Sequence, residues 1–454
     1  MSESSKAIAY AKNNHARYLA ELKELLAIPS ISTLSQHKPD MQRAAEWLSK
    51  QLSGIGFKQV AIMPTGGHPV VYGEWLGKPG KPTVLVYGHY DVQPVDPLNE
   101  CTTAPFEPTV RGDNIYARGA SDMKGQALAF LKALEALAKN EGLPINVKVL
   151  LEGEEEIGSM NLGAFIEKNK EKLKCDFVLN ADAGIMSPTQ PSLTYGLRGL
   201  AYFELWVYGP KQDLHSGVFG GSVNNPAQVL CELIAGMHDA DGRITLPGFY
   251  DKVRALPAEE RKDIAHPSDD EWRAMSGVPQ LYGEKGFTTA ERLGTRPTLE
   301  VCGILSGFTG EGAKTVLPAK AMAKISTRLV PYQDDKEVES QLRAYLQKHA
   351  PPTVRWELKK FVTGPAVLVK RETPGMRAAI KALEATFGKK PVFKLEGGSV
   401  PVVSMVQQTL GVDSILLGFG LPDDNLHSPN EKLHLPNFYR GVEAYIRFFD
   451  EVGE

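Results

Sequence analysis

Residues 145–159 read INVKVLLEGEEEIGS and join an apolar run to a cluster of acids. The run Val147–Leu151 predicts a buried β-strand. Glutamates follow it at positions 152, 154, 155 and 156. Amphipathic patterns before the strand, at residues 121–140, and after it, at residues 161–173, predict helices. A buried strand between two helices is typical of an α/β layer with a largely parallel sheet.

The alternation of strands and helices continues on both sides of this stretch. Further strands are expected at residues 82–88 (PTVLVYG), 175–182 (CDFVLNAD) and 414–420 (SILLGFG), and further helices at 41–56, 375–388 and 436–452. From about residue 196 to 375 the pattern changes to an α+β block. We therefore expect a mainly parallel α/β domain, formed by residues 1–195 and 376–454, that is split by a lid-like α+β domain at residues 196–375.

Composition excludes several classes of protein. The chain has 454 residues, of which 42% are hydrophobic and 23% charged, so two domains, or three, are expected from its length. A net charge of −3, with the two signs interspersed, gives no reason to expect nucleic acid or an anionic membrane as a partner. The N-terminus reads as an amphipathic helix rather than a signal peptide, and no apolar run approaches the roughly 18 residues of a membrane span. Four cysteines without a CxxC pair are typical of reduced thiols, so we expect a soluble, cytoplasmic protein.

The glutamate cluster needs compensation for its charge, either from water on a solvated loop or from cations that line a site. Other predicted strand and loop ends carry residues of metal-binding types: His89 and Asp91, Asp122, Asp182 and His427. In open α/β sheets, functional side chains collect beyond the carboxyl ends of the strands. We therefore expect these side chains to meet at one edge of the sheet.

Each of these residues also has an ordinary explanation. Asp122 could cap a helix, His89 could be a structural histidine, and His427 could lie in a solvated loop. Their coincidence at one edge favours a site for two divalent cations about 3.5–4 Å apart, held by two histidines and three carboxylates. An apolar strand that ends in acids also resembles a Walker B strand. However, GKPGKPT (77–83) lacks the P-loop spacing and opens no helix, which excludes nucleotide binding of that kind.

Ten motifs together resemble the di-zinc exopeptidase family of carnosinases, carboxypeptidases and aminoacylases, and most closely its dimeric cytosolic dipeptidase branch. They are GHYDVQP, YARGASDMKG, LLEGEEEIGS, NAD, YGLRG, DLHSGVFGG, SGFTGEGAKTVLP, RLVP, EGGSVP and HSPNEKL, in this order from residue 88 to residue 433. The resemblance implies a metal-dependent hydrolase with two divalent ions per subunit, zinc or manganese, and a lid domain that also forms a homodimer.

The resemblance also implies roles for individual residues of the metal centre. The implied metal ligands are His89, Asp122, Glu156, Asp182 and His427, with Asp122 bridging the two ions. Asp91 resembles the carboxylate that orients a ligand histidine, and Glu155 resembles the general base. Of the remaining glutamates, Glu152 is expected to be structural, and Glu154 is assigned no role.

Further residues are implied to bind the substrate. His215, a loop histidine by spacing alone, would stabilise the oxyanion in the partner subunit's active site. Arg328, which could also lie on a solvated strand face, would bind the substrate's terminal carboxylate, and Thr315, Gly398 and Ser399 would contact the same end. The chain departs from carnosinases near FVTGPAV (361–367), which carries no histidine. The substrate's C-terminal side chain is therefore expected to meet a different surface.

The sequence thus predicts a metallo-dipeptidase acting on small dipeptides with a free C-terminal carboxylate. An amidohydrolase for N-acylated or N-carbamoylated amino acids is the alternative with the same chemistry. A catalytically silent metal-binding scaffold is a third possibility, but its signature would be loss of the base or a ligand, and all of these are present.

Overall fold

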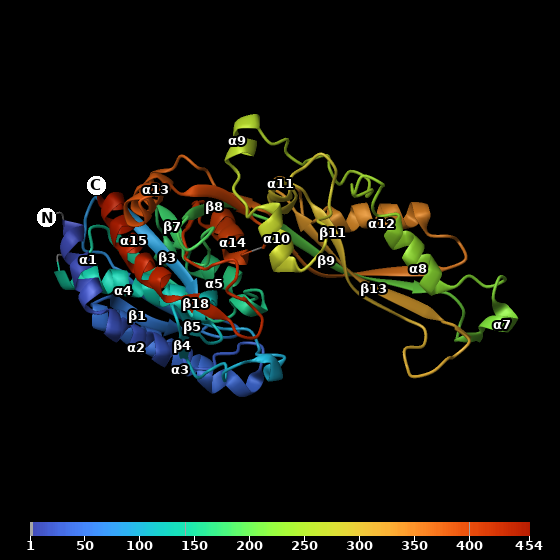
Figure 1. Cartoon of the computed structure of the whole chain (residues 1–454), viewed down its shortest axis with the longest axis horizontal. Helices are drawn as coiled ribbons and strands as arrows, with labels where there is room; N and C mark the ends of the chain where they lie inside the picture. The colour runs from blue at the N-terminus through green and yellow to red at the C-terminus, as the bar shows by residue number, and fades with distance from the viewer. Residues whose placement is uncertain (1–2, 141, 399) are drawn as a thin grey trace. The chain divides into compact units, whose positions relative to one another are not determined.

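The computed structural model describes residues 3–140, 142–398 and 400–454. The chain divides into two compact units: the first comprises Met1–Tyr195, Val369–Lys394 and Val400–Glu454, and the second Gly196–Leu368 and Leu395–Ser399. The blue N-terminal and red C-terminal helices of Figure 1 therefore belong to the same unit. The sequence pattern predicts the return to this unit at residue 376. In the structure it falls at Val369, where the Val369 N–H already donates a hydrogen bond to the Tyr195 carbonyl, 2.8 Å away.

The first unit is built on a sheet with the strand order β1-β2-β6-β3-β7-β17-β8. The short strands β15 and β16 lie where the chain passes between the two units. The strands are β1 (Lys58–Met63), β2 (Val70–Trp75), β3 (Thr83–His89), β6 (Asn146–Glu152), β7 (Phe177–Asn180), β8 (Ser192–Leu197), β15 (Val367–Leu368), β16 (Val392–Glu396) and β17 (Ser414–Leu416). The central strands β6, β3, β7 and β17 are parallel neighbours. Except for the partly buried Phe177 at the start of β7, their apolar residues are buried, as is typical of parallel strands covered on both faces.

Helices flank this sheet. They are α1 (Glu3–Asn13), α2 (His15–Leu26), α3 (Lys38–Ile55), α4 (Gly125–Asn140), α5 (Leu162–Lys168), α6 (Lys170–Leu173), α13 (Pro374–Phe387), α14 (Pro401–Thr409) and α15 (Leu435–Gly453). Every residue of α4 from Gly125 to Leu137 is buried, and α15 packs on both α4 and α13. A small antiparallel sheet of β18 (Lys432–His434), β5 (Asn114–Tyr116) and β4 (Thr109–Arg111) lies beside the start of α15.

The second unit contains an antiparallel sheet of the order β11-β13-β9-β14. Its strands are β9 (Gly199–Tyr208), β11 (Thr298–Ser306), β13 (Lys320–Leu329) and β14 (Arg355–Gly364), and a separate pair joins β10 (Leu214–His215) to β12 (Val316–Leu317). Its helices are α7 (Ser216–Phe219), α8 (Pro226–Ala235), α9 (Ala258–Asp263), α10 (Asp269–Ser276), α11 (Thr289–Gly294) and α12 (Val338–His349).

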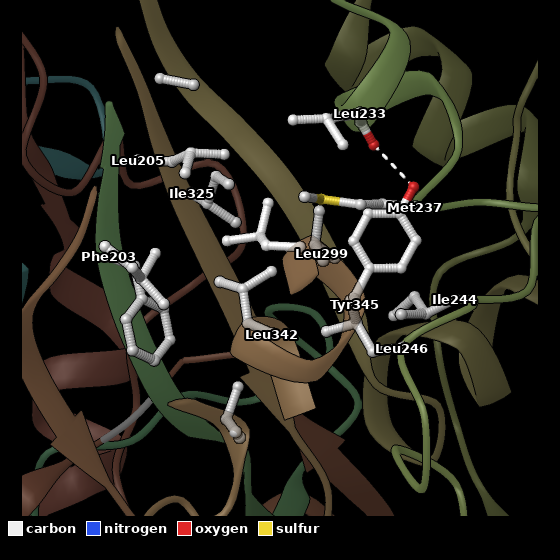
Figure 2. Packing of buried hydrophobic residues seen from close by; sticks show 14 of the residues in the cluster. Phe203, Leu205, Leu233, Met237, Ile244, Leu246, Leu299, Ile325, Leu342 and Tyr345 are labelled. Carbon is white, nitrogen blue, oxygen red and sulfur yellow. Dashed lines mark hydrogen bonds between the residues drawn. The ribbon is translucent and has the colours of Figure 1, made fainter. Parts of the chain in front are cut away.

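The core of the second unit lies on one face of this sheet. Residues alternate between buried and partly exposed along β9, so Phe203 and Leu205 face inward with Ile325 of β13. Figure 2 shows these side chains packed against Leu342 and Tyr345 from α12. The predicted α/β class, with a mainly parallel sheet and an α+β insertion, is confirmed. No helix within the described ranges is both long enough and apolar enough to cross a membrane.

Candidate metal centre

Three neighbouring parallel strands bring acids and a histidine to one edge of the first unit's sheet. His89 is the last residue of β3, Glu155 and Glu156 form a short 3₁₀ turn just after β6, and Asp182 follows β7. Because these strands run in the same direction, their carboxyl ends meet. Asp122 joins them from the turn before α4.

The side chains form two groups of the size that a metal ion requires. The ligand atoms of His89, Asp122 and Asp182 all lie within 4.8 Å of one another, and so do those of Asp122, Glu156 and His427. Asp122 is common to both groups: its Oδ1 lies 3.1 Å from His89 Nε2 and its Oδ2 lies 2.9 Å from His427 Nε2. The structure thus brings together all five residues that the sequence suggested as ligands.

Asp91 holds two parts of this centre in place. One of its carboxylate oxygens lies 3.3 Å from His89 Nδ1, which leaves His89 Nε2 to face Asp122. The same carboxylate accepts hydrogen bonds from the backbone N–H groups of Glu155 (3.2 Å) and Glu156 (3.0 Å). Asp91 therefore contacts both the His89 imidazole and the backbone of the glutamate turn, which is the geometry expected of a carboxylate that orients a ligand histidine.

The glutamates of residues 152–156 divide into two kinds. Glu152 accepts hydrogen bonds from the Tyr87 hydroxyl and the Ser159 hydroxyl, and burial raises its pKa to about 8. Glu154 is also buried and accepts hydrogen bonds from the His68 backbone N–H and the Asn161 amide. Both have protein partners in the interior and belong to neither ligand group.

The remaining charges at this edge perturb one another strongly. Burial raises the pKa of Asp182 to about 7, and the neighbouring Asp122 adds to the effect. Burial also raises the pKa of Glu155 against the opposing effect of His89, and Asp182 and Glu156 add to the rise. Hydrogen bonds with Asp122 and Glu156 raise the pKa of His427 to about 10. Acids packed this closely need positive charge, and divalent cations supply it.

The donor set fits two divalent cations. Imidazole nitrogens and carboxylate oxygens are ligands for zinc, manganese and cobalt, and a carboxylate that faces both groups is suited to bridge two ions. Gln93 further fixes one ligand, because its side-chain amide donates to Glu156 Oε2 at 2.8 Å.

Comparison with known proteins identifies the family. The model of peptidase family M20/M25/M40 matches residues 85–451. The chain belongs to this family. The resemblance found in the sequence motifs is therefore confirmed, and the protein is an M20-type metallopeptidase, a hydrolase.

Relatives of this M20 peptidase match along nearly the whole chain. The Cys-Gly metallodipeptidase DUG1 of Candida albicans is 33% identical and aligns with 95% of this chain and 94% of its own. The human Beta-Ala-His dipeptidase is 31% identical and aligns with 99% of this chain and 92% of its own. Among solved structures, the M20 family metallo-carboxypeptidase Sso-CP2 of Sulfolobus solfataricus is 36% identical with a TM-score of 0.87, and the match covers 96% of this chain and 99% of that one.

Sequence reasoning missed one buried acid that lies beside the candidate metal centre of this M20 peptidase. Glu431 is buried, and its carboxylate contacts the turn that carries Asp122. It lies in the motif HSPNEKL, four residues after His427, but nothing in that pattern indicates which residues it contacts. Burial raises the pKa of Glu431 to about 7, while Arg118 acts in the opposite direction.

The residues suggested for substrate binding lie in the second unit of the peptidase. His215 is exposed at the start of α7, and its Nδ1 accepts a hydrogen bond from the Gly217 N–H. Thr315 is its neighbour, because the Ser216 N–H donates to the Thr315 carbonyl. Arg328 is partly buried in β13 between Thr298 and Leu200 of the flanking strands.

A glycine segment completes this set of second-unit residues. Gly398 follows Gly397, whose carbonyl accepts a hydrogen bond from Arg198 Nε at 3.1 Å. Ser399 lies outside the described residues.

Proposed function

We propose that this M20 peptidase is a metallo-dipeptidase that hydrolyses small dipeptides with a free C-terminal carboxylate. The observation that carries the proposal is the pair of ligand groups that share Asp122, with Glu155 next to the ligand Glu156. Full-length similarity to proteins named Cys-Gly metallodipeptidase and Beta-Ala-His dipeptidase supports the same substrate class.

We assign two zinc or manganese ions per subunit to this centre. His89 and Asp182 would hold one ion, Glu156 and His427 the other, and Asp122 both. When bound, such ions polarise the substrate carbonyl and lower the pKa of water towards about 7. Glu155 would take one proton from the attacking water and pass it to the nitrogen of the leaving amine, so that water is divided between the new carboxylate and the new amine.

The substrate's carboxylate end is assigned to the second unit. The guanidinium of Arg328 suits two carboxylate oxygens at once, and Thr315, Gly398 and Ser399 would add hydroxyl and backbone contacts. Phe361 and Val362 are exposed on β14, in the segment where the sequence departs from the carnosinase pattern, so the side chain of the C-terminal residue would meet an apolar surface.

A substrate comparison tests this function against the alternative of an N-acyl or N-carbamoyl amino acid hydrolase. We expect Ala-Leu to be hydrolysed with a kcat/KM at least about 100-fold above that of N-acetyl-leucine, because a site built for a free amine leaves polar groups unpaired beside an acetamide. Initial rates with Cys-Gly and β-Ala-His extend the panel. Faster hydrolysis of N-acetyl-leucine than of every dipeptide would reject the dipeptidase assignment.

A homodimer completes the proposed active site, with His215 contributed across the interface. His215 is exposed at the end of β10, and Val218 and Phe219 beside it are 68% and 39% exposed, which leaves apolar surface for a second copy to cover. Its ring would donate a hydrogen bond to the substrate oxygen as negative charge develops there.

Mixing two inactive variants tests the shared site. His215→Ala and Glu155→Gln subunits, unfolded and refolded together, are expected to regain activity that each lacks alone. One of the two sites in a mixed dimer then has both intact residues, so about half of the wild-type kcat per mixed dimer is expected. Mass spectrometry verifies the mixed species. Absence of recovery in verified mixed dimers would exclude a contribution of His215 from the partner.

We place the enzyme in the cytoplasm, where thiols stay reduced. Its cysteines, Cys101, Cys175, Cys231 and Cys302, are all free, which supports this assignment.

A further inference from the structure

The turn that carries Asp122 is held by hydrogen bonds to Glu431, a residue distant in the sequence. Asp122 itself has non-helical backbone angles (φ −114°, ψ 95°), so the helix α4 that follows does not fix its position. Glu431 does: its Oε1 accepts hydrogen bonds from the backbone N–H groups of Ser121 (3.0 Å) and Asp122 (3.0 Å). Its Oε2 accepts from the Gly119 N–H at 2.8 Å. Three of the four N–H groups from Gly119 to Asp122 thus converge on one carboxylate.

Both oxygens of the Glu431 carboxylate accept hydrogen bonds. Arg118 Nη1 donates to Oε2 at 2.8 Å, which gives each oxygen two hydrogen bonds. Both side chains are buried, with exposures of 3% for Glu431 and 4% for Arg118. An amide in place of this carboxylate would offer one oxygen and present an NH₂ group to N–H donors, so no neutral side chain of the same shape can replace it.

Arg118 extends the arrangement to a second ligand. Its Nη2 donates to the carbonyl of Ser428, the neighbour of His427, and to the carbonyl of Pro94, each at 3.2 Å. The backbone of His427 has a positive φ of 60°, a conformation that a non-glycine residue keeps only where its surroundings hold it. The pair Glu431–Arg118 therefore joins the Asp122 turn to the His427 loop.

We propose that Glu431 is a positioning residue of the metal centre, which sets the place of the shared ligand Asp122 and, through Arg118, that of His427. The proposal rests on the metal centre of the proposed function. Loss of Glu431 should weaken metal binding most at the group of Asp122, Glu156 and His427. Two of the three members of this group depend on the Glu431–Arg118 pair. The group of His89, Asp122 and Asp182 depends on it through one member only.

Cobalt binding tests the proposal without reference to activity. Metal-stripped wild type and Glu431→Gln are titrated with Co²⁺, and affinity is followed by calorimetry and ligand geometry by visible absorbance. We expect one of the two equivalents to bind about 10–100-fold more weakly in the variant, as is usual when a residue that orients a ligand is lost. Its absorption band should shift, and the other equivalent should change less. Glu74→Gln, which removes a buried carboxylate that contacts Tyr72 instead of the turn, is the matched control and should bind as wild type.

The outcomes separate this inference from the function on which it rests. Wild type that binds fewer than two ions contradicts the proposed metal centre. Wild type that binds two, with Glu431→Gln unchanged in both affinities and spectrum, overturns the role of Glu431 alone. Equal weakening of both equivalents also overturns the assignment to the His427 group.

A second variant covers the case that Glu431→Gln does not fold, which circular dichroism of the metal-free protein detects. Arg118→Lys keeps a cation beside Glu431 but loses the fork that reaches Ser428 and Pro94. It should weaken the same equivalent about 10-fold. Wild-type affinity in Arg118→Lys would exclude the link to the His427 loop.

Discussion

Replacement of Glu155 by glutamine is expected to lower kcat about 10²–10⁴-fold while both metal ions remain bound. Glu155 belongs to neither ligand group, so the ions keep their ligands in the variant. Its place beside the centre is set by the backbone, because the Glu155 N–H donates to Asp91 and a glutamine at this position retains that bond. The amide cannot accept a proton, and the transfer from water to the leaving nitrogen is lost.

Steady-state kinetics and metal analysis on the same samples check this expectation. Glu154→Gln is the matched control, since Glu154 precedes the base by one residue but is bound to His68 and Asn161 in the interior. It should keep kcat within about threefold of wild type if the protein folds, because the loss of a buried hydrogen bond away from the reacting atoms acts on stability rather than on the reaction. Wild-type turnover by fully loaded Glu155→Gln would show that another residue is the base.

Removal of the metal ions is expected to bring hydrolysis of Ala-Leu down to the uncatalysed background. Without them, carbonyl polarisation and the acidification of water are lost together. The thermal midpoint of unfolding should fall as well, because ions that bind the native state stabilise it by mass action and offset the repulsion among Asp122, Asp182 and Glu156. Addition of zinc, manganese or cobalt, one at a time, to the stripped protein should restore both properties and show which ion gives the highest kcat.

Two observations would contradict this expectation. One is full activity in protein whose metal content, measured by elemental analysis, is far below one ion per chain. The other is an unchanged thermal midpoint on addition of every ion, which would show that the acids at this edge bind no cation. A chelator control on a metal-independent peptidase excludes interference with the assay.

The candidate ligand residues could be grouped from the sequence because their positions follow from local patterns. A buried strand has a recognisable end, and parallel strands deliver their ends to one edge, so His89, Asp122, Asp182 and His427 could be gathered without coordinates. The glutamate cluster is harder to resolve. The chain leaves β6 in a 3₁₀ turn at Glu155–Ile157, where the alternation of strand faces no longer applies, so periodicity alone could not separate Glu156 from Glu154.

The contacts of Glu431 could not be predicted because most of its partners are backbone groups, which leave no pattern in the sequence. Its partners at Gly119, Ser121 and Asp122 are backbone N–H groups about 310 positions away, and any sequence that forms the same turn would present them. For a similar reason the pattern gave no sign that residues 395–398 group with the second unit, since so short a segment has no periodicity of its own.

In the proposed metal centre a single carboxylate, that of Asp122, would serve both ion sites and so would couple their occupancies. Whichever cation arrives first withdraws negative charge on which the other site also depends, so the later arrival is held less firmly. Under metal scarcity a population of such molecules would pass through a half-loaded state instead of dividing into empty and complete enzymes. Its hydrolytic capacity would then respond to metal supply over a wide range of concentrations, without a sharp threshold.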